Sequence, residues 1–167
     1  MTEAGKLPAV DEATVGEMFR QSMRRLASSV SVVACLADGE WVGMSATSVT
    51  SLTMDPPALL VCVNKQASMA AHLTLGMHFS VNLLNREHEG LSAAFGSSKL
   101  RAERFKDGGW AAGSSGVPVM GEALAAIECT VDKMVEYGSH VIVIGRVEEV
   151  RMGNEAHPLV YFDGKYR

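Results

Sequence analysis

The chain has 167 residues, of which 47% are hydrophobic and 20% are charged, and its formal net charge is −4. A chain of this length fits one domain with a hydrophobic core of its own. The small negative charge gives no broad attraction to nucleic acid or to anionic lipid, so the composition argues against both kinds of partner. We expect a mobile, polar lead-in over residues 1–12 and one folded domain over residues 13–167.

The three cysteines, Cys35, Cys62 and Cys129, each lie inside an apolar, strand-like run rather than in a CxxC pair. An odd, scattered set of this kind is typical of reduced thiols, which predicts a cytoplasmic protein. The first residues, MTEAGKLPAV, have no apolar signal region, and no apolar stretch approaches the ~18 residues of a membrane-spanning helix. We therefore expect neither export nor membrane insertion.

An amphipathic helix is predicted from Thr14 to about Ser28. Thr14 and Glu17 have the spacing of a capping box. Apolar residues follow at helical spacing, while arginines take the other face as a solvated surface. The apolar residues are Val15, Met18, Phe19, Met23 and Leu26.

Strands and short helices follow. Extended runs are predicted at 30–36 and 41–44, joined by an Asp38-Gly39 hairpin turn, and again at 58–64 and 78–84. Between the last two, Ser68 is expected to cap a short helix that Gly76 ends. Asn85 is expected to cap another helix running to Phe95.

The second half is dominated by extended segments. Residues 96–121 are rich in Gly and Ser and are expected to form loop and short helix. Long strands are predicted at 124–135 and 140–150, and a short pair at 159–162 and 165–167. Six or seven strands without regular β-α-β alternation favour a mainly β, antiparallel barrel decorated by a few short helices.

Common catalytic motifs are absent. The sequence has no GxGxxG after a strand, no GxxxxGK[ST] and no GxSxG, which argues against a Rossmann site, a P-loop and a nucleophile elbow. The five histidines show no HExxH or HxH spacing, so no protein-bound metal is expected.

The segment GMSATSVTSLTMDPP at 43–57 is dense in hydroxyls and has a single charge. Backbone amides and hydroxyls without bulk suit a planar heterocycle with a ribityl-phosphate tail, although an ordinary polar turn between strands has the same composition. The next strand ends in Asn64-Lys65-Gln66-Ala67-Ser68, where an ammonium, an amide and a helix start could meet a phosphate. By itself a lysine in this position is more often a solvated strand end.

Several segments together resemble the flavin reductase-like family of split-barrel flavoproteins in order and spacing. They are FRQSMRRLASSVSVVACLADG, GMSATSVTSLTMDPPALLVCVNKQAS, FSVNLLN, FG, RF, ALAAIECTV, GSHVIVIGRVEEV and PLVYFDGKYR, and they extend from about Phe19 to Tyr166. The resemblance is strongest to small NAD(P)H:flavin oxidoreductases that act as reductase components of two-component aromatic monooxygenases, such as the 4-hydroxyphenylacetate 3-monooxygenase type.

The resemblance implies a six-stranded antiparallel Greek-key split β-barrel, usually a homodimer with flavin sites near the subunit interface. It implies flavin-ring and ribityl contacts from residues 44–50 and a phosphate clamp at the end of the next strand, with a pocket closed by Phe95 and Asn82. The implied cofactor-binding residues are Met44, Ser45, Ala46, Thr47, Ser48, Val49, Thr50, Asn64, Lys65, Ser68, Asn82 and Phe95. His140 is implied beside the nicotinamide, and Ser139 stands where many relatives have Asp.

The implied function is hydride transfer from NADH or NADPH to FMN or FAD, with reduced flavin supplied to a partner monooxygenase. Because the two cofactors carry this chemistry, the absence of an acid, base or nucleophile motif is consistent with it. Two alternatives stay open: a flavin-binding electron carrier without turnover, and a reductase serving another acceptor such as a corrin cobalt or a ferric chelate. The sequence leaves the choice of flavin and of nicotinamide open.

Overall fold

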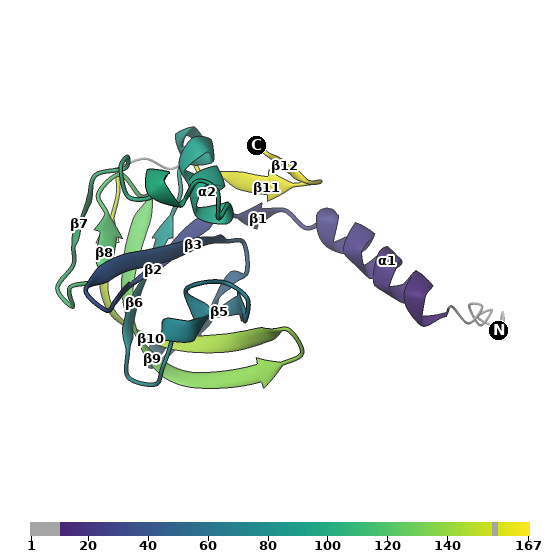
Figure 1. Ribbon diagram of the computed structural model, residues 1–167, viewed down its shortest axis with the longest axis horizontal. Coiled ribbons are helices and arrows are strands. Elements are labelled where there is room, and N and C mark those ends of the chain that lie inside the picture. The colour runs from purple at the N-terminus through teal and green to yellow at the C-terminus, as the bar shows by residue number, and fades with distance from the viewer. Residues whose placement is uncertain (1–10, 155–156) are drawn as a thin grey trace.

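Strands are the main secondary structure of the protein, as the computed structural model of residues 11–154 and 157–167 shows (Figure 1). The strands are β1 (Ser28–Ser29), β2 (Ser31–Ala37), β3 (Glu40–Ala46), β4 (Val49–Met54), β5 (Pro57–Asn64), β6 (His78–Leu83), β7 (Trp110–Ala112), β8 (Pro118–Met120), β9 (Ala125–Tyr137), β10 (His140–Met152), β11 (Val160–Phe162) and β12 (Lys165–Tyr166). The α-helices are α1 (Glu12–Arg24) and α2 (Glu89–Gly96), and single 3-10 turns are η1 (Ala70–His72), η2 (Arg86–His88) and η3 (Arg101–Glu103).

The main sheet has seven strands in the order β3-β2-β6-β9-β10-β5-β4, and every neighbouring pair is antiparallel. The expected mainly β, antiparallel class is therefore confirmed. Strands β1, β11 and β12 form a small second sheet, and β7 pairs with β8. The described residues hold more strands than the six or seven expected. β11 and β12 match the predicted short pair at 159–162 and 165–167, whereas β1, β7 and β8, each two or three residues long, and the hydroxyl-rich β4 were not predicted.

The core has two parts, one on each side of β2. Successive strand residues point to opposite faces, so Val33 and Cys35 join one apolar cluster while Val32 and Ala34 join the other. The first cluster fills the barrel around Phe79, and the second lies under α2 around Phe95. This explains why the predicted β2 run is apolar on both faces: from Ser31 to Cys35 both faces of the strand are buried.

The start of the chain differs from the expectation. Asp11, not Thr14, caps α1: its side chain accepts hydrogen bonds from the Thr14 amide at 2.9 Å and the Thr14 hydroxyl at 2.7 Å. The predicted capping box was therefore wrong. The helix ends at Arg24 rather than near Ser28, because the chain at Ser28 already forms β1, which pairs with β11. Of the expected mobile lead-in, residues 1–10 lie outside the described residues, and Glu12 is helical.

Two further expectations are corrected. Most of the hydroxyl-rich segment, which lay between the predicted strands at 41–44 and 58–64, is itself extended. β3 continues to Ala46, and β4 covers Val49–Met54, because β-branched residues such as Val49 and Thr50 fit a paired strand. Ser68 makes no cap, since η1 begins after Met69 without a side-chain capping bond. By contrast, Asn85 caps η2 as expected, accepting from the Glu87 amide at 2.9 Å.

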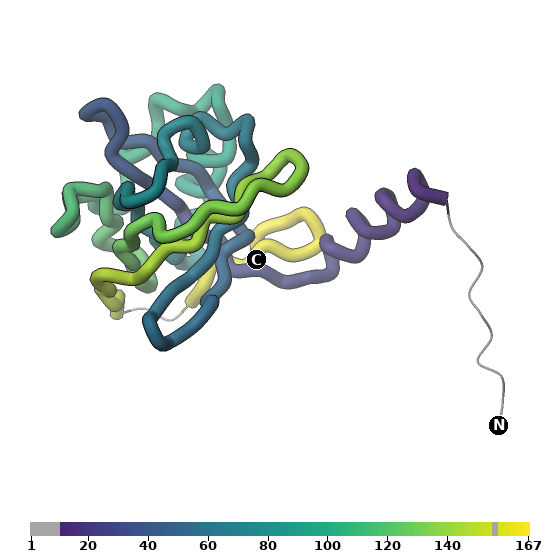
Figure 2. Tube along the Cα trace, turned by 90° about the horizontal axis from the view of Figure 1, so that it is seen from below, coloured from purple at the N-terminus to yellow at the C-terminus, as the bar shows by residue number. Residues whose placement is uncertain are grey.

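The Asp38-Gly39 hairpin turn is confirmed, and both residues have positive φ, as a tight turn between twisted strands requires. Helix α1 extends away from the barrel in both Figure 1 and Figure 2. No helix within residues 11–154 and 157–167 combines the length and the apolar character needed to cross a membrane.

Candidate functional site

A cavity of about 410 Å³ lies where β3, the turn after β5 and the C-terminal end of α2 meet. We call it the α2 cavity. Small and polar residues line most of it, with two arginines and one aromatic ring: Gly43, Met44, Ser45, Asn64, Gln66, Ala67, Ser68, Phe95, Gly96, Ser98, Arg101 and Arg104. The structure thus brings together five residues expected to bind the cofactor, namely Met44, Ser45, Asn64, Ser68 and Phe95.

Arg104 holds two walls of the α2 cavity together. Its guanidinium donates to the Gly43 carbonyl on β3 at 2.9 Å and to three carbonyls at the end of α2, those of Ala94 at 3.0 Å, Phe95 at 3.3 Å and Ser97 at 3.1 Å. The last carbonyls of a helix have no partner within the helix, so a cation there also complements the helix dipole. Burial, and then the nearby charge of Arg101, lowers the pKa of Arg104.

Close backbone approach defines the cavity floor. A Cβ atom on Gly43 would lie 2.8 Å from the Phe95 ring and 3.1 Å from the Val33 carbonyl, so only glycine fits there without displacement. A Cβ on Gly96 would meet the Ser45 hydroxyl oxygen at 3.1 Å. The two glycines let α2 sit directly on β3 and leave the space in front of Ser45 open.

Arg101 and Lys65, the two cations considered for an anionic ligand, differ in whether a carboxylate already pairs with them. Arg101 lines the cavity, and among the described residues no carboxylate lies within ion-pairing distance of its guanidinium. The Lys65 ammonium instead forms an ion pair with Glu136 at 2.6 Å, and hydrogen bonding and charge from Lys65 lower the pKa of that carboxyl. Lys65 is not part of the cavity lining within the described chain. Arg101 is therefore the better-placed positive charge for an anionic ligand.

The turn after β5 is joined to the turn before β10. Asn64 closes its own turn by accepting from the Gln66 amide at 2.9 Å, and the Lys65 amide donates to the Ser139 carbonyl at 3.0 Å. His140 pairs in register with Asn64 across the sheet. The structure therefore places His140 next to the segment that borders the α2 cavity. The Ser139 hydroxyl lies 2.9 Å from His140 Nδ1, where it can fix the orientation of the exposed imidazole.

The remaining expected residues are dispersed. Ala46 is buried in the core, and the Ser48 hydroxyl donates to the Cys62 carbonyl at 2.9 Å, which fixes β4 against β5. Thr47 borders a hollow beside α1, whereas Val49 and Thr50 border an apolar groove on β4 and β5. The resemblance groups these residues around one ligand; in the single chain, Thr47 borders one hollow, and Val49 and Thr50 border another.

Asn82 lies away from the α2 cavity. It is fully buried, donates to the Val32 carbonyl at 3.2 Å and the Ser80 hydroxyl at 2.9 Å, and accepts from the Met120 amide at 2.9 Å. With its donors and acceptor used inside the core, Asn82 is placed to fix β8 against the sheet rather than to contact a ligand.

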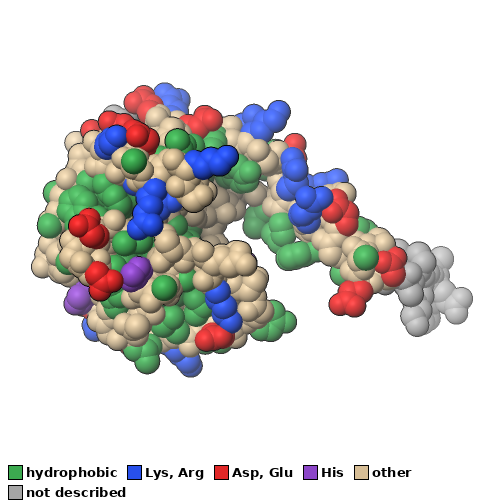
Figure 3. All heavy atoms as spheres, viewed as in Figure 1, with side chains coloured by type: hydrophobic (Ala, Val, Ile, Leu, Met, Phe, Trp, Pro, Cys, Tyr) green, Lys and Arg blue, Asp and Glu red, His purple; other side chains and the backbone are tan. Residues whose placement is uncertain are grey.

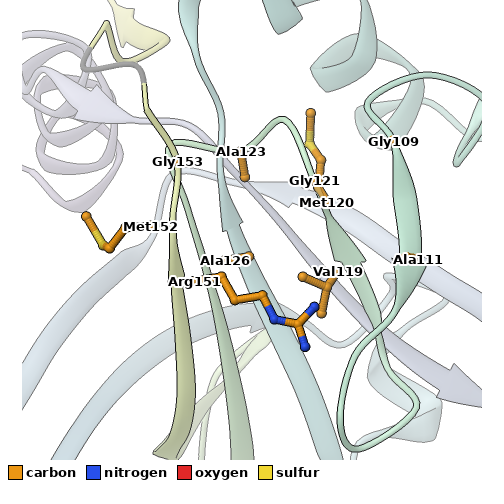
Figure 4. Close-up of a pocket in the computed structure, with 10 residues that line it drawn as sticks. All are labelled: Gly109, Ala111, Val119, Met120, Gly121, Ala123, Ala126, Arg151, Met152 and Gly153. Carbon is orange, nitrogen blue, oxygen red and sulfur yellow. The ribbon is translucent and has the colours of Figure 1, made fainter.

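A smaller cavity of about 110 Å³ lies around Arg151, between β8, β9 and β10 (Figure 4). The Arg151 guanidinium lies 3.3 Å from the carboxylate of buried Glu128, which also accepts from the amides and hydroxyls of Ser114 and Ser115. Burial raises the pKa of Glu128, but these hydrogen bonds outweigh it and the net pKa is lowered. Because its charges are already paired, this cluster fixes the 113–116 loop and offers little to a ligand.

Sequence reasoning did not include Arg104, Gly96 or Ser98 in the site. Arg101 was likewise not predicted to bind the cofactor. These residues come well after the motifs at 43–57 and 64–68 in the sequence, so only the folded chain shows that they meet. One signal was present: FG and RF, at Phe95-Gly96 and Arg104-Phe105, belong to the segments that carry the resemblance. Within the described residues there is no group of three or more His, Cys, Asp or Glu side chains able to hold a metal ion.

Comparison with known proteins shows what the chain resembles. Residues 23–167 match the model of the flavin reductase like domain. An FMN reductase (NADH), RutF 2 of Rhizobium rhizogenes, is 35% identical over 95% of this chain and 91% of its own. The reductase component of an FADH(2)-dependent resorcinol hydroxylase from Rhizobium sp. is 36% identical over 91% of this chain and 86% of its own.

A solved structure of a flavin-reducing enzyme is also similar to this chain. The NADH:FAD oxidoreductase SgcE6 of Streptomyces globisporus, in complex with NAD and FAD fragments, superposes with a TM-score of 0.84 at 27% identity. The match covers 96% of each chain.

Proposed function

The chain belongs to the flavin reductase-like family, and from this premise we propose that it is an NADH-dependent flavin reductase that supplies reduced flavin to a partner monooxygenase. The observation that carries the proposal is the family match over residues 23–167 together with the relatives named as NADH-dependent FMN reductases. The reductase component of the resorcinol hydroxylase supports the coupling to a monooxygenase.

The residues of the α2 cavity fit a flavin. Arg101 offers an uncompensated positive charge within the described chain, which suits a phosphate, and the Gln66–Ser68 turn adds hydroxyl and amide groups. Ser45 and the open space before Gly96 suit a polar, planar group without bulk. We propose that Arg101 and Ser68 hold the flavin phosphate, while Met44, Ser45 and Phe95 contact the remainder of the molecule.

When bound, the flavin supplies a hydride acceptor and the nicotinamide supplies the hydride, so the redox chemistry belongs to the cofactors. The chain's own residues bind and orient. Arg104 keeps β3 and α2 at a fixed separation, and the hydrogen-bonded turns at 64–68 and 138–140 hold His140 at the edge of the site. We propose that His140 positions the nicotinamide and that Ser139 fixes the imidazole in place of a carboxylate.

We further propose that the protein works as a homodimer in the cytoplasm. The free cysteines, of which Cys35 and Cys129 are buried, support a reducing compartment. Neither point is needed for the reductase proposal.

The test is to measure initial rates with each of the four combinations of NADH or NADPH with FMN or FAD. We expect NADH oxidation that depends on added flavin and follows saturation in both substrates. A protein that binds flavin tightly, never exchanges it and turns over no nicotinamide would be a carrier instead. Turnover that requires a corrin cobalt or ferric chelate, with free flavin inactive, would favour the third alternative.

A further inference from the structure

One ion pair beside the α2 cavity uses a cation that a phosphate would also attract. The Lys65 ammonium lies 2.6 Å from a carboxylate oxygen of Glu136. Lys65 stands in the turn after β5, between Asn64 and Gln66, and both of these neighbours line the α2 cavity. Glu136 lies on β9, one residue before the end of that strand. The two charges are far apart in the sequence, so only the fold brings them together.

The backbone holds both ends of this ion pair in place. The Lys65 amide donates to the Ser139 carbonyl at 3.0 Å, which joins the turn after β5 to the turn between β9 and β10. Val141 on β10 pairs with Val63 on one side and with Glu136 on the other. The turn after β5 lies beside the β9–β10 hairpin in both Figure 1 and Figure 2. The Lys65 side chain therefore reaches from the end of β5 past the start of β10 to a carboxylate on β9.

The ion pair contributes little to the stability of the fold. The side chains of Lys65 and Glu136 are 41% and 77% exposed. Water screens such a pair, and ordering two long side chains opposes it. Hydrogen bonding and charge from Lys65 lower the pKa of Glu136, so the carboxylate is ionised at neutral pH. What the contact changes is the charge that Lys65 presents to its surroundings.

Few free cations border the α2 cavity, so each one matters to an anionic ligand. Arg104 already donates to four carbonyls, which leaves Arg101 as the other arginine of the lining. In the view of Figure 3, acidic and basic side chains are interspersed over the barrel, with no broad patch of one sign. A phosphate monoester carries about 1.5–2 negative charges at pH 7 and would attract a second cation beside Arg101. Lys65 stands next to the lining, but Glu136 neutralises its charge.

We propose that Glu136 is a positioning residue that competes with the flavin phosphate for the Lys65 ammonium and thereby keeps flavin binding weak enough for exchange. The inference rests on the proposed function, in which reduced flavin must leave the protein to reach a monooxygenase. Lysine suits such a competition, because its ammonium is a point charge on a flexible four-carbon stem and can turn from one anion to another. Affinity differences within one site appear mainly in the dissociation rate, so a neutralised Lys65 favours rapid release.

A competitor and a structural brace predict opposite results when Glu136 is made neutral. If the ion pair only braced the turn after β5 against the hairpin, Glu136→Gln would loosen that turn and weaken flavin binding. If Glu136 competes with the phosphate, the same change frees Lys65, and FMN should bind more tightly. Riboflavin has no phosphate and should bind as it does to the wild type.

The experiment measures the dissociation constants of FMN and riboflavin by quenching of flavin fluorescence, without nicotinamide. We expect Glu136→Gln to bind FMN about threefold to fivefold more tightly, as one partly exposed charge contact allows, and to release it more slowly by a similar factor. Asp132→Asn removes an exposed carboxylate from the same strand and is the matched control for net charge. Asp132 lies about 13 Å along β9 from Glu136, beyond the screening length of about 8 Å at physiological ionic strength, so both constants should stay at their wild-type values.

Removing Lys65 tests the path through which Glu136 acts. In the wild-type background, where the lysine is neutralised, Lys65→Ala should raise the FMN dissociation constant by about twofold or less. In the Glu136→Gln background, Lys65→Ala should remove the whole gain in FMN affinity, so the two substitutions are strongly non-additive. Glu136→Asp keeps the charge on a shorter side chain and should give an FMN affinity between those of the wild type and Glu136→Gln.

Three results would overturn the inference: FMN binding to Glu136→Gln that is unchanged or weaker, a tightening that riboflavin shares, or a tightening that persists without Lys65. The inference and the proposed function fail separately, because binding is measured without nicotinamide. A wild type that reduces FMN with NADH, but whose Glu136→Gln variant binds FMN no more tightly, overturns the inference alone. A tightening through Lys65 in a protein that oxidises no NADH supports the inference and overturns the reductase function.

Discussion

Replacing Arg104 with alanine should damage both the stability of the protein and its flavin site. The substitution removes four hydrogen bonds from a charged donor to the carbonyls of Gly43, Ala94, Phe95 and Ser97. Such bonds contribute about 1.5–3 kcal/mol each when taken singly. They share one guanidinium, however, and carbonyls bordering the cavity can regain water. We therefore expect a net loss of about 2–4 kcal/mol.

For a domain of this size, 1 kcal/mol corresponds to about 2–4 °C in melting temperature, so Arg104→Ala should melt about 5–15 °C below the wild type. Because the Gly43 and α2 walls would no longer be held together, the dissociation constants for FMN and for riboflavin should both rise about tenfold or more, equivalent to about 1.4 kcal/mol. Arg104→Lys keeps the charge but not the planar fork, so it should recover only part of either loss.

Arg101→Ala is the matched comparison, because Arg101 lines the same cavity and is exposed. Its melting temperature should stay within about 2 °C of the wild type, as expected for a surface change. Its FMN affinity should fall about tenfold through loss of a charged phosphate contact, while riboflavin, which has no phosphate, should bind unchanged. Differential scanning fluorimetry and quenching of flavin fluorescence supply the measurements. Wild-type stability and flavin affinity in Arg104→Ala would refute the reasoning.

Three further predictions address single side chains. Lys65→Ala should raise the flavin KM by less than Arg101→Ala does, because Lys65 is paired with Glu136. Steady-state kinetics at saturating NADH measure both effects. An equal or larger effect of Lys65→Ala would make Lys65 the main phosphate contact, as the resemblance implies. His140→Ala should raise the NADH KM and leave the flavin dissociation constant unchanged, with Ser139→Ala giving a smaller effect in the same direction; normal NADH kinetics would remove His140 from the site. Glu128→Gln should lower the free energy of unfolding at pH 7 by about 2–4 kcal/mol, since a buried, multiply hydrogen-bonded carboxylate is lost. The folded-state pKa of Glu128 is lowered, so its contribution to the free energy of unfolding is present above the ordinary carboxyl pKa and is lost as the pH falls through the folded-state pKa. Chemical denaturation should therefore show a smaller difference in stability between the wild type and Glu128→Gln at pH 4 than at pH 7. The same difference at both pH values would contradict this prediction.

Much of the fold could be predicted from the sequence because its strands have strong local signals. The runs at 58–64, 78–84 and 140–150 are apolar and β-branched, and turn residues such as Asp38-Gly39 separate them. What local pattern could not give is pairing that depends on distant segments. β1 forms only because β11, more than 100 residues later, lies beside it. The cap of α1 is different: Asp11 bonds Thr14 three residues away, so that prediction chose the wrong one of two local candidates.

In the candidate site, too, local sequence motifs predicted some residues, whereas others are brought in only by the fold. The order and spacing of the motifs were enough to indicate the turn at 64–68 and the end of β3 at Met44 and Ser45, both of which border the α2 cavity. Asn82 satisfies its polar groups inside the core, which a strand pattern cannot distinguish from a pocket position. Arg104 was missed because its importance comes from four carbonyls that only the folded chain collects.

The most direct measurement of the central claim is a count of turnovers under anaerobic conditions, with purified protein at a small fraction of the FMN concentration and NADH in excess. The account predicts that the flavin absorbance bleaches completely, with many FMN molecules reduced per protein chain. Bleaching that stops at one flavin per chain, or an NADH absorbance that stays constant, would contradict it.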